Sequence, residues 1–579
     1  MTVSQGKGGI FAAVREKWAI VRSDDRLMVI ALAACVGLFS GLAAVALTRA
    51  LHFMAHHLAG AHHQWWGFLL PALGATLAAL FINVILRERP GHGVPEVVLA
   101  VLRHGGRLRF RSSFSRLVAS SLTIGSGGSA GPEAPVVVSG AALGSNFGQL
   151  FGLNERQRTT LVGCGAAGAI GAIFNAPIAG LVFTVEVILG EWRAFNVVPI
   201  AIAAVAGTQI SRVLQGNQIA FAHQQFHIGL ADIGASFGVA VMATIGAVAL
   251  ARMINGMQHV AARTPLPRWL RPAVGGAAVG LIGIFLPFVM GEGYQSVQQA
   301  IDGVFAQGVA WAALAVAAKI LATTLTIGWG GAGGIFAPSL MVGSLIGVLY
   351  YRLLIWALPM ADWTNEGFFA LLGMAGMISG ILQAPLTGIF LVVEITGGYD
   401  VIVPLIIVSV LTATFCHYLE PGSFYLRELI ERGDYMRPGT DARVLADLKV
   451  QEVMTAEPVN VPNDMLLGDF VNLLEQTPGL VYPVYDCGSG DYLGMVFADR
   501  IRPYLFDPRM HTMLIVEQLM ADDIPAVQAG DDLAGALELM DAHGLQHLPV
   551  VAGHRCIGVL SKEKLLDHYR KELIVQTGG

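Results

Sequence analysis

Two stretches of sequence, 203 residues apart, decide the fold. Residues Thr123–Gly144 read TIGSGGSAGPEAPVVVSGAALG, residues Thr326–Gly347 read TIGWGGAGGIFAPSLMVGSLIG, and the two are identical at 10 of 22 positions. A second pair, Asn175–Val187 (NAPIAGLVFTVEV) and Gln383–Ile395 (QAPLTGIFLVVEI), follows in the same order at an offset of 208. Two matched pairs in one order indicate a duplicated domain, whose repeats we predict at about 27–215 and 230–420. Duplicated halves are typical of transport pathways, with the binding site where the halves meet.

Composition divides the 579-residue chain into two parts. Hydrophobic residues make up 54% of the chain and charged residues only 13%, with a mean hydropathy of +0.61, which excludes a purely soluble protein. Residues 436–579 nevertheless hold 11 Lys and Arg and 21 Asp and Glu, whereas the first 435 residues hold 25 and 20. We therefore predict a membrane domain over residues 27–432, a linker over 433–445 and an acidic, water-soluble tail.

The N-terminal segment, residues 1–26, carries basic side chains before the first long apolar run. By the positive-inside rule we predict that this segment is cytoplasmic. The five cysteines include no CxxC pair, so they indicate neither a zinc site nor a disulfide framework, and the tail suits a reducing cytoplasm. The predicted location is the inner membrane of a bacterium, with segment 1–26 and the tail on the cytoplasmic side.

Each long repeat contains a glycine-rich loop followed by a helix with a proline in its first turn. The loops are Gly125–Gly131, before Pro135, and Gly330–Gly334, before Pro338. Proline is tolerated there because the first N–H groups of a helix have no partner within the helix. Glycines let those N–H groups point outward at the positive end of the helix dipole, which binds an anion without a cationic side chain.

A third loop of this kind is GHGVPE at residues 91–96. We predict that the backbone at Gly93 and Gly131 takes part in binding an anion. The long repeats differ in charge at one position, where Glu133 in the first corresponds to Phe336 in the second. A carboxylate at an anion site either occupies that site or leaves it when protonated, so we predict that Glu133 is a gate and proton acceptor. The alternative is a glutamate that only complements the helix dipole.

In these motifs the chain resembles the CLC chloride channels and chloride/proton antiporters over roughly residues 25–430. The segments that carry the resemblance are GHGVPE at 91–96, GPEAP at 131–135, NAPIAG at 175–180, GGIFAP at 333–338, QAPLTGIFLVVE at 383–394 and GSFYLREL at 422–429. The resemblance implies an all-α polytopic membrane domain, built as an inverted repeat with broken helices, and a homodimer with one anion path per subunit. It also implies that Glu133 is the external gate, that the amides of Ile335 and Phe336 bind the central anion, and that Tyr425 donates its hydroxyl on the inner side.

One departure from the family pattern is His92, at a position where the family usually has serine. A neutral imidazole offers one N–H, and a protonated one adds a positive charge. We therefore expect His92 to make anion affinity depend on pH or to shift selectivity from chloride toward another anion; the alternative is an imidazole packed away from the path. Lys319, within an apolar run, either lends positive potential to the anion path or is a structural lysine.

A second departure is Val187, where proton-coupled members commonly have a glutamate. Because valine cannot carry a proton, the sequence favours a passive, gated chloride channel, and the chloride/proton antiporter stays the alternative. The neighbouring Glu186 lies at the same proton-path position but corresponds to Glu394 in the other repeat. That correspondence favours a structural role for both glutamates.

The tail contains a repeat of its own, in which Pro483-Val484 recurs as Pro549-Val550. Each unit is predicted to form a short strand, an amphipathic helix, two strands and a helix. The units, residues 446–508 and 513–573, resemble a pair of CBS domains, an α/β fold that often binds adenine nucleotides. At the positions that usually hold the ribose, the chain has Phe497 with Arg500 and Ser561 with Lys564. Neither position has the usual acid, so dimer contact and linkage to gating are the preferred interpretation over nucleotide control.

The rival from another class is an intramembrane metalloprotease with CBS domains. Such an enzyme needs an HExxH helix, and the sequence contains none. We therefore predict a transport protein without enzymatic activity, metal site, required cofactor or nucleic-acid partner. Its predicted partners are chloride or another small anion, protons, the lipid bilayer and a second copy of the chain.

Overall fold

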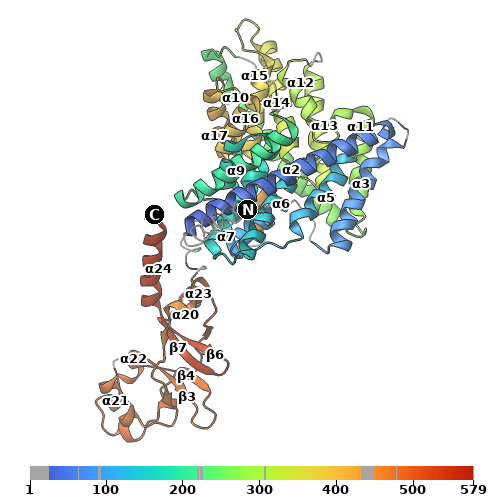
Figure 1. Cartoon of the computed structure of the whole chain (residues 1–579). Helices are drawn as coiled ribbons and strands as arrows, with labels where there is room; N and C mark the ends of the chain where they lie inside the picture. Colours follow the sequence, from blue (N-terminus) through green and yellow to red (C-terminus); the bar gives the residue numbers. More distant parts are fainter. Residues whose placement is uncertain are drawn as a thin grey trace, which may run out of the picture. The chain divides into compact units, whose positions relative to one another are not determined.

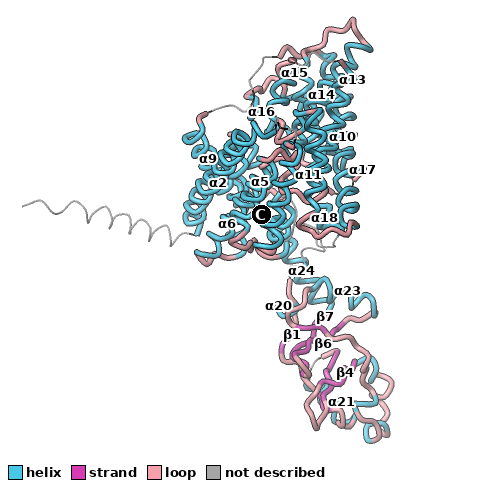
Figure 2. The backbone as a smooth tube through the Cα atoms, turned by 90° about the vertical axis from the view of Figure 1, so that its right-hand side faces the viewer, coloured by secondary structure: helices cyan, strands magenta, loops and turns pink. Residues whose placement is uncertain are grey.

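The computed structural model describes residues 25–62, 64, 66–88, 93–217, 221, 226–304, 308–420, 422–431, 445, 448–477 and 479–577. The chain divides into two compact units, Met1–Tyr435 and Met436–Gly579. The division falls inside the predicted linker, 433–445. In the described ranges the first unit is helical, and all strands lie in the second unit (Figure 2).

The first repeat of the membrane domain consists of helices and short 3₁₀ and π segments. Its elements are α2 (Asp25–His62), η1 (Gly67–Leu69), α3 (Leu70–Leu80), η2 (Phe81–Ile85), α4 (Val94–Arg103), α5 (Ser112–Gly125), α6 (Glu133–Leu150), α7 (Glu155–Phe174), α8 (Pro177–Phe183), η3 (Thr184–Leu189) and α9 (Ala194–Gln215). The second repeat comprises α10 (Leu230–Arg263), α11 (Arg271–Phe285), η4 (Pro287–Val289), α12 (Tyr294–Ile301), α13 (Val309–Gly328), α14 (Phe336–Ala357), α15 (Glu366–Leu382), α16 (Pro385–Thr396), α17 (Ile402–Leu419) and α18 (Phe424–Glu431). Figure 1 shows α2, α6, α7 and α9 packed together, and likewise α10, α14, α15 and α17.

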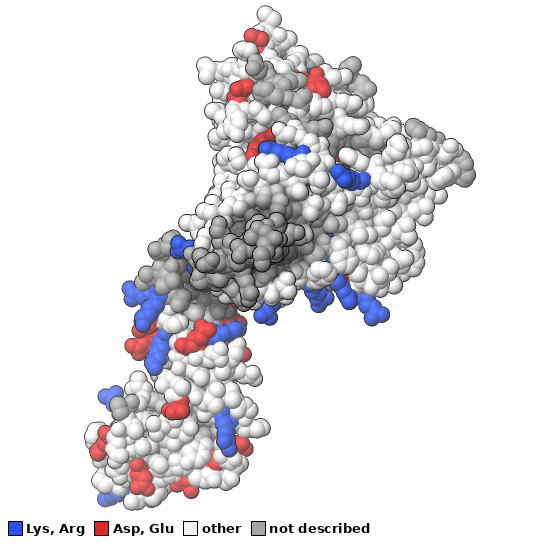
Figure 3. Space-filling model, viewed as in Figure 1, with Lys and Arg blue, Asp and Glu red and all other residues white. Residues whose placement is uncertain are grey.

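Seven helices within the described ranges are long and apolar enough to cross a membrane, judged by length and composition. They are Arg26–Ala61, Gly67–Ile85, Ala194–Gln215, Leu230–Arg263, Val309–Gly328, Phe336–Ala357 and Ile402–Glu431. Four apolar helices are shorter: Pro177–Leu189, Arg271–Phe285, Glu366–Leu382 and Pro385–Thr396. A helix of this length ends before it has crossed a bilayer of ~30 Å, so its terminal N–H and C=O groups need partners in the protein. This agrees with the predicted broken helices. Charged side chains are sparse over the membrane helices and frequent on the tail (Figure 3).

The two long glycine loops bind each other at the centre of the membrane domain. The N–H of Gly131 donates to the carbonyl of Gly334 at 2.8 Å, and the N–H of Gly334 donates back to the carbonyl of Gly131 at 2.7 Å. Two more bonds make the same exchange: Ser129 N–H to Thr326 Oγ1 (3.0 Å) and Ala332 N–H to Thr123 Oγ1 (3.2 Å). Because corresponding residues of the two repeats swap roles, a local two-fold axis passes between the loops. The contact brings the N-termini of α6 and α14 together.

Glycines also let neighbouring helices touch along their backbones in each repeat. A methyl group at Gly144 of α6 would overlap the carbonyl oxygen of Leu161 in α7. In the second repeat, a methyl group at Gly347 of α14 would overlap the carbonyl oxygen of Phe369 in α15. The pairs Gly140 with Gly165 and Gly343 with Gly373 repeat this contact. In lipid the hydrophobic effect does not drive helices together, and close packing, which small residues allow, takes its place. Much of the glycine content therefore serves helix packing.

The C-terminal unit contains two small sheets with flanking helices. Its elements are α20 (Val450–Val453), β1 (Thr455–Ala456), β2 (Val461–Pro462), α21 (Leu467–Gln476), β3 (Val481–Tyr485), β4 (Tyr492–Phe497), α22 (Ala498–Ile501), η5 (Met510–Thr512), η6 (Val516–Gln518), β5 (Val527–Gln528), α23 (Leu533–His543), β6 (His547–Ala552), β7 (Arg555–Ser561) and α24 (Lys562–Thr577). One sheet has the order β2-β3-β4 and the other β1-β7-β6-β5. In the first module β2 is parallel to β3, and β3 is antiparallel to β4. The second module repeats this pattern, with β5 parallel to β6 and β6 antiparallel to β7.

The two modules exchange their first residues. Strand β1 precedes the first module's own sheet but pairs with β7 of the second module. In return, Ala521 of the second module pairs with Met495 in β4 of the first. The cause is apolar burial, because Val450 and Val453 of α20 belong to the core of the second module. The spatial modules therefore differ from the linear division at 446–508 and 513–573.

We expect Gly144→Ala and Gly347→Ala each to lower the apparent Tm of the detergent-solubilised protein. The added methyl group must displace backbone, and overpacking of this kind costs about 1–3 kcal/mol. The matched control is Gly256→Ala in α10, where nothing lies within 4 Å of the added methyl group. We expect the control to keep or slightly raise the Tm, because alanine favours a helix over glycine. Equal Tm values for all three variants would contradict the backbone contacts.

Candidate anion-binding site

The carboxylate of Glu133 lies where the two repeats meet. Glu133 is the first residue of α6 and is fully buried. One carboxylate oxygen accepts a hydrogen bond from the hydroxyl of Tyr294, and the other accepts from the backbone N–H of Ala337 at 3.4 Å. Ala337 belongs to the first turn of α14, so the carboxylate of one repeat occupies the N-terminal end of a helix of the other. A free anion would take the same position, because the positive end of the helix dipole favours negative charge.

Gly131 leaves the space that this carboxylate occupies. A methyl group at Gly131 would overlap Oε2 of Glu133 and would lie 3.0 Å from the backbone nitrogen of Ala337. The same residue makes both backbone bonds to Gly334. A side chain at position 131 would therefore disturb both the carboxylate position and the contact between the repeats.

Ile335 and Phe336 begin the helix that faces Glu133. Ile335 immediately precedes α14, Phe336 is its first residue, and both are buried. Their N–H groups belong to the turn that has no acceptor within the helix. The ring of Phe336 packs against Phe174 and Phe183 at centroid distances of 5.6 and 5.9 Å. The side chain of Phe336 thus has apolar partners, and its N–H belongs to the same first turn as the N–H of Ala337, which reaches Glu133.

The third glycine loop is described from Gly93 onward, and His92 lies outside the described residues. Gly93 has a φ of +80° and immediately precedes α4, which has a proline in its first turn. Arg116 of α5 lies beside this helix end, because its Nε would be 3.4 Å from a Cβ atom at Gly93. Its guanidinium is also 3.5 Å from the carboxylate of Glu96. This helix N-terminus therefore has a buried arginine next to it.

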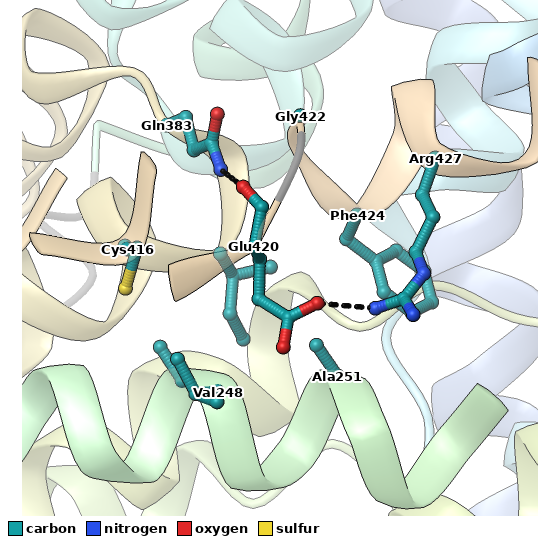
Figure 4. Close-up of a pocket in the computed structure, with 11 residues that line it drawn as sticks. Val248, Ala251, Gln383, Cys416, Glu420, Gly422, Phe424 and Arg427 are labelled. Carbon is teal, nitrogen blue, oxygen red and sulfur yellow. Dashed lines mark hydrogen bonds and ion pairs between the residues drawn. The ribbon is translucent and has the colours of Figure 1, made fainter. Parts of the chain in front are cut away.

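Tyr425 is buried in α18, whose start is held in place by Glu420. The carboxylate of Glu420 forms ion pairs with Arg427 of α18 and Arg252 of α10, and its carbonyl accepts from Nε2 of Gln383 at 3.1 Å. Figure 4 shows Glu420 between Gln383 and Arg427. The hydroxyl of Tyr425 is close enough to Glu133 for an electrostatic interaction between them. The structure therefore brings Tyr425 and Glu133 into one region, although 292 positions separate them in the sequence.

Lys319 positions a loop that the sequence interpretation missed. It is fully buried in α13, and its Nζ donates to the carbonyls of Val289 at 2.9 Å and Gly291 at 3.0 Å. The loop then carries Glu292 and Tyr294 to the side of Glu133. The signal in the sequence is GEGY at 291–294, where two glycines with φ of +64° and +90° precede α12. It has the same glycine-then-helix form as the loops that were recognised.

Glu186 and Glu394 bind each other's helices. Four backbone bonds run from Ile178 N–H (3.0 Å) and Ala179 N–H (2.7 Å) to Glu394, and from Leu386 N–H (3.1 Å) and Thr387 N–H (2.7 Å) to Glu186. The hydroxyl of Thr387 adds a fifth bond, to Glu186 at 2.7 Å. Each carboxylate therefore caps the first turn of a short broken helix, α8 or α16, in the opposite repeat. Val187 lies beside Glu186 in the π-helical segment η3 and is buried.

The family profile described as voltage gated chloride channel matches residues 74–417, which is more than half of the chain. The chain belongs to this family, the CLC proteins. A putative chloride channel protein ClcB-like from Ralstonia nicotianae (strain GMI1000) is 31% identical over 423 residues, covering 70% of this chain and 97% of the relative. The H(+)/Cl(-) exchange transporter ClcA of Vibrio cholerae is 29% identical over 417 residues, covering 69% and 88%.

A crystal structure of a eukaryotic CLC transporter has the fold of this CLC chain. The TM-score is 0.62 at 17% identity, and the match covers 93% of this chain and 98% of that chain. The fold class is therefore the predicted one, a CLC inverted repeat with broken helices followed by an α/β tail. The CBS family matches residues 516–571, within the second predicted module. The family that matches residues 74–417 is named for chloride transport, which is not an enzymatic reaction.

The tail of this CLC chain places a cation where CBS pairs usually have an acid. Nζ of Lys564 donates to Oγ1 of Thr455 at 2.8 Å, and the N–H of Lys564 donates to Oγ of Ser561 at 3.2 Å. An ammonium group has no acceptor for the hydroxyls of a ribose. Lys564 therefore contacts Thr455 and Ser561 through donors alone.

We expect Glu186→Gln and Glu394→Gln to lower the apparent Tm of this CLC protein by similar amounts. Each change replaces a charged acceptor at the start of a helix with a neutral amide, which costs about 1–3 kcal/mol. We also expect that neither change alters how anion flux into liposomes depends on pH. If Glu186→Gln altered that dependence and Glu394→Gln did not, Glu186 would be a proton carrier and not a structural cap.

Proposed function

We propose that this protein carries chloride across a membrane and that the carboxylate of Glu133 is its gate. The supporting observation is the position of that carboxylate, which accepts hydrogen bonds from Tyr294 and from the N–H of Ala337 at the start of α14. In that position it competes with chloride for the same donors. When Glu133 takes up a proton and turns away, these donors become free to bind chloride.

Passive, gated conduction is the mode that we propose. Coupled exchange needs a protonatable group between Glu133 and the far side of the membrane. Val187 cannot bind a proton, and the carboxylate of Glu186 is engaged by the first turn of α16. Chloride/proton exchange is the second candidate, because the relative from Vibrio cholerae is named an exchange transporter. In that case water would have to carry the proton past Val187.

We also propose a homodimer in the inner membrane of a bacterium, with segment 1–26 and the tail in the cytoplasm. The basic residues of that segment support this orientation. We propose that the tail acts through contacts within the dimer and on gating, without an adenine nucleotide. The pairing of Lys564 with Thr455 supports this choice.

Reconstitution into liposomes tests the proposed gate. We expect the full-length protein to move chloride down its gradient without driving protons uphill. We expect Glu133→Gln to raise chloride flux about tenfold at a pH one unit above the pKa of the gate. Glutamine mimics the protonated glutamate, and only about a tenth of the parent protein is protonated at Glu133 at that pH. Glu155→Gln, at an exposed carboxylate that begins α7, is the control with unchanged flux. Uphill proton movement would favour the exchange candidate, and a parent protein that moves no anion would contradict the proposal.

His92 is the position at which a preference for another anion would arise. We expect His92→Ser to change the ratio of chloride flux to fluoride and nitrate flux in the same liposomes, and to weaken its dependence on pH between about 6 and 7. An unchanged ratio and an unchanged pH profile would remove His92 from the anion path.

A further inference from the structure

A cavity of about 370 Å³ adjoins the Glu133 site. Its polar lining includes Glu292, Tyr294 and Gln295, together with His52 of α2. Glu292 is half-buried, so its carboxylate can exchange protons with water in the cavity. Tyr294 also lines the cavity, and its hydroxyl binds Glu133. It therefore stands between the carboxylate of Glu133 and the cavity. Glu292 therefore lies two residues before Tyr294, the hydrogen-bond partner of Glu133, and lines the same cavity as Tyr294.

The charge next to Glu292 is the ammonium group of Lys319. Lys319 is fully buried, and two of its three donors are used by the carbonyls of Val289 and Gly291. Carbonyl groups bind an ammonium group but do not neutralise it, and a buried charge is costly unless an opposite charge is near. Glu292 lies between Gly291, whose carbonyl accepts from Nζ of Lys319, and Gly293, where a Cβ atom would be 3.4 Å from that Nζ, and its charge interacts with those of Lys319 and Glu133. The negative charge of Glu292 offsets the positive charge of Lys319 and repels the negative charge of Glu133.

We propose that Glu292 is a proton-binding site that controls the affinity of the Glu133 site for anions. When Glu292 is ionised, its charge offsets Lys319 and repels an anion at the N-terminus of α14. A proton from cavity water that adds to a carboxylate oxygen of Glu292 removes both effects, so the charge of Lys319 acts on the bound anion. Acidification therefore raises anion affinity. The inference rests on the proposed function and adds a regulator to its site.

The titratable and charged groups that face Glu292 come from several elements. Among the described residues they are His52 from α2, Glu133 from α6, Tyr294 from α12 and Lys319 from α13. Residues Ile124 and Gly125 of α5 and Met341 of α14 also adjoin this loop or its cavity, and they carry no charge. Because Glu133 and His52 are ionisable side chains as well, the experiment replaces each of them separately.

Calorimetric titration of the purified full-length protein with chloride is the test, in a Glu133→Gln background that cannot titrate at the gate. From about pH 8 to about pH 5 we expect chloride affinity to rise about fivefold, as for one partly screened charge. Adding Glu292→Gln should give the high affinity at every pH, and Glu292→Asp, which keeps the carboxylate, should restore the pH dependence. Adding His52→Asn or Glu155→Gln should leave it unchanged.

Each other outcome has a distinct meaning. If Glu133→Gln with Glu292→Gln kept the pH dependence, or if His52→Asn abolished it, Glu292 would not be the proton site and the inference would be overturned. A pH-independent affinity in Glu133→Gln alone would overturn it as well. If no chloride bound at any pH, the proposed anion site itself would fail. The apparent Tm of each variant, measured in parallel, shows that the protein compared is folded.

Discussion

Two backbone hydrogen bonds between Gly131 and Gly334 hold the N-termini of α6 and α14 against each other. Each of these helix ends carries a partial positive charge of about half an elementary charge, so the contact brings two like charges together inside the protein. Negative charge is needed to balance them. Glu133 supplies it, because its carboxylate reaches the N–H of Ala337 across the two-fold axis. The site is thus a consequence of the way the repeats join.

The two-fold relation is used twice, with different results. At the short helices α8 and α16 it is kept, since Glu186 and Glu394 each cap the helix of the other repeat. At the long helices it is broken, since Phe336 stands where the first repeat has Glu133. Phe336 packs into an aromatic cluster with Phe174 and Phe183 and stabilises the helix start. One scaffold therefore holds a carboxylate on one side and a packed ring on the other.

Local sequence patterns predicted much of this arrangement. The duplicated segments, the glycine loops and the Glu133–Phe336 difference are visible in the sequence because each is a short pattern or a comparison of two such patterns. The match of Glu186 with Glu394 predicts equivalent roles for the two, and each carboxylate binds the first turn of the other repeat's short helix. The part played by Tyr294 could not be predicted, because it binds Glu133 from 161 positions along the chain through a loop held by Lys319. The exchange of first residues between the tail modules was also missed, since β1 and β7 lie a hundred residues apart.

The sequence by itself determined that this chain is a duplicated membrane protein with bare helix ends, a glutamate in one of the two matched loops and a phenylalanine in the other, and an α/β tail. These properties depend on residue type and spacing, which glycine, proline and apolar periodicity set locally. Only the tertiary structure decided which partners those helix ends receive. Hydrogen bonds such as Gly131 to Gly334 and Tyr294 to Glu133 join residues more than 150 positions apart, and their geometry follows from packing the whole domain. The same packing placed Glu292 and Lys319 near Glu133.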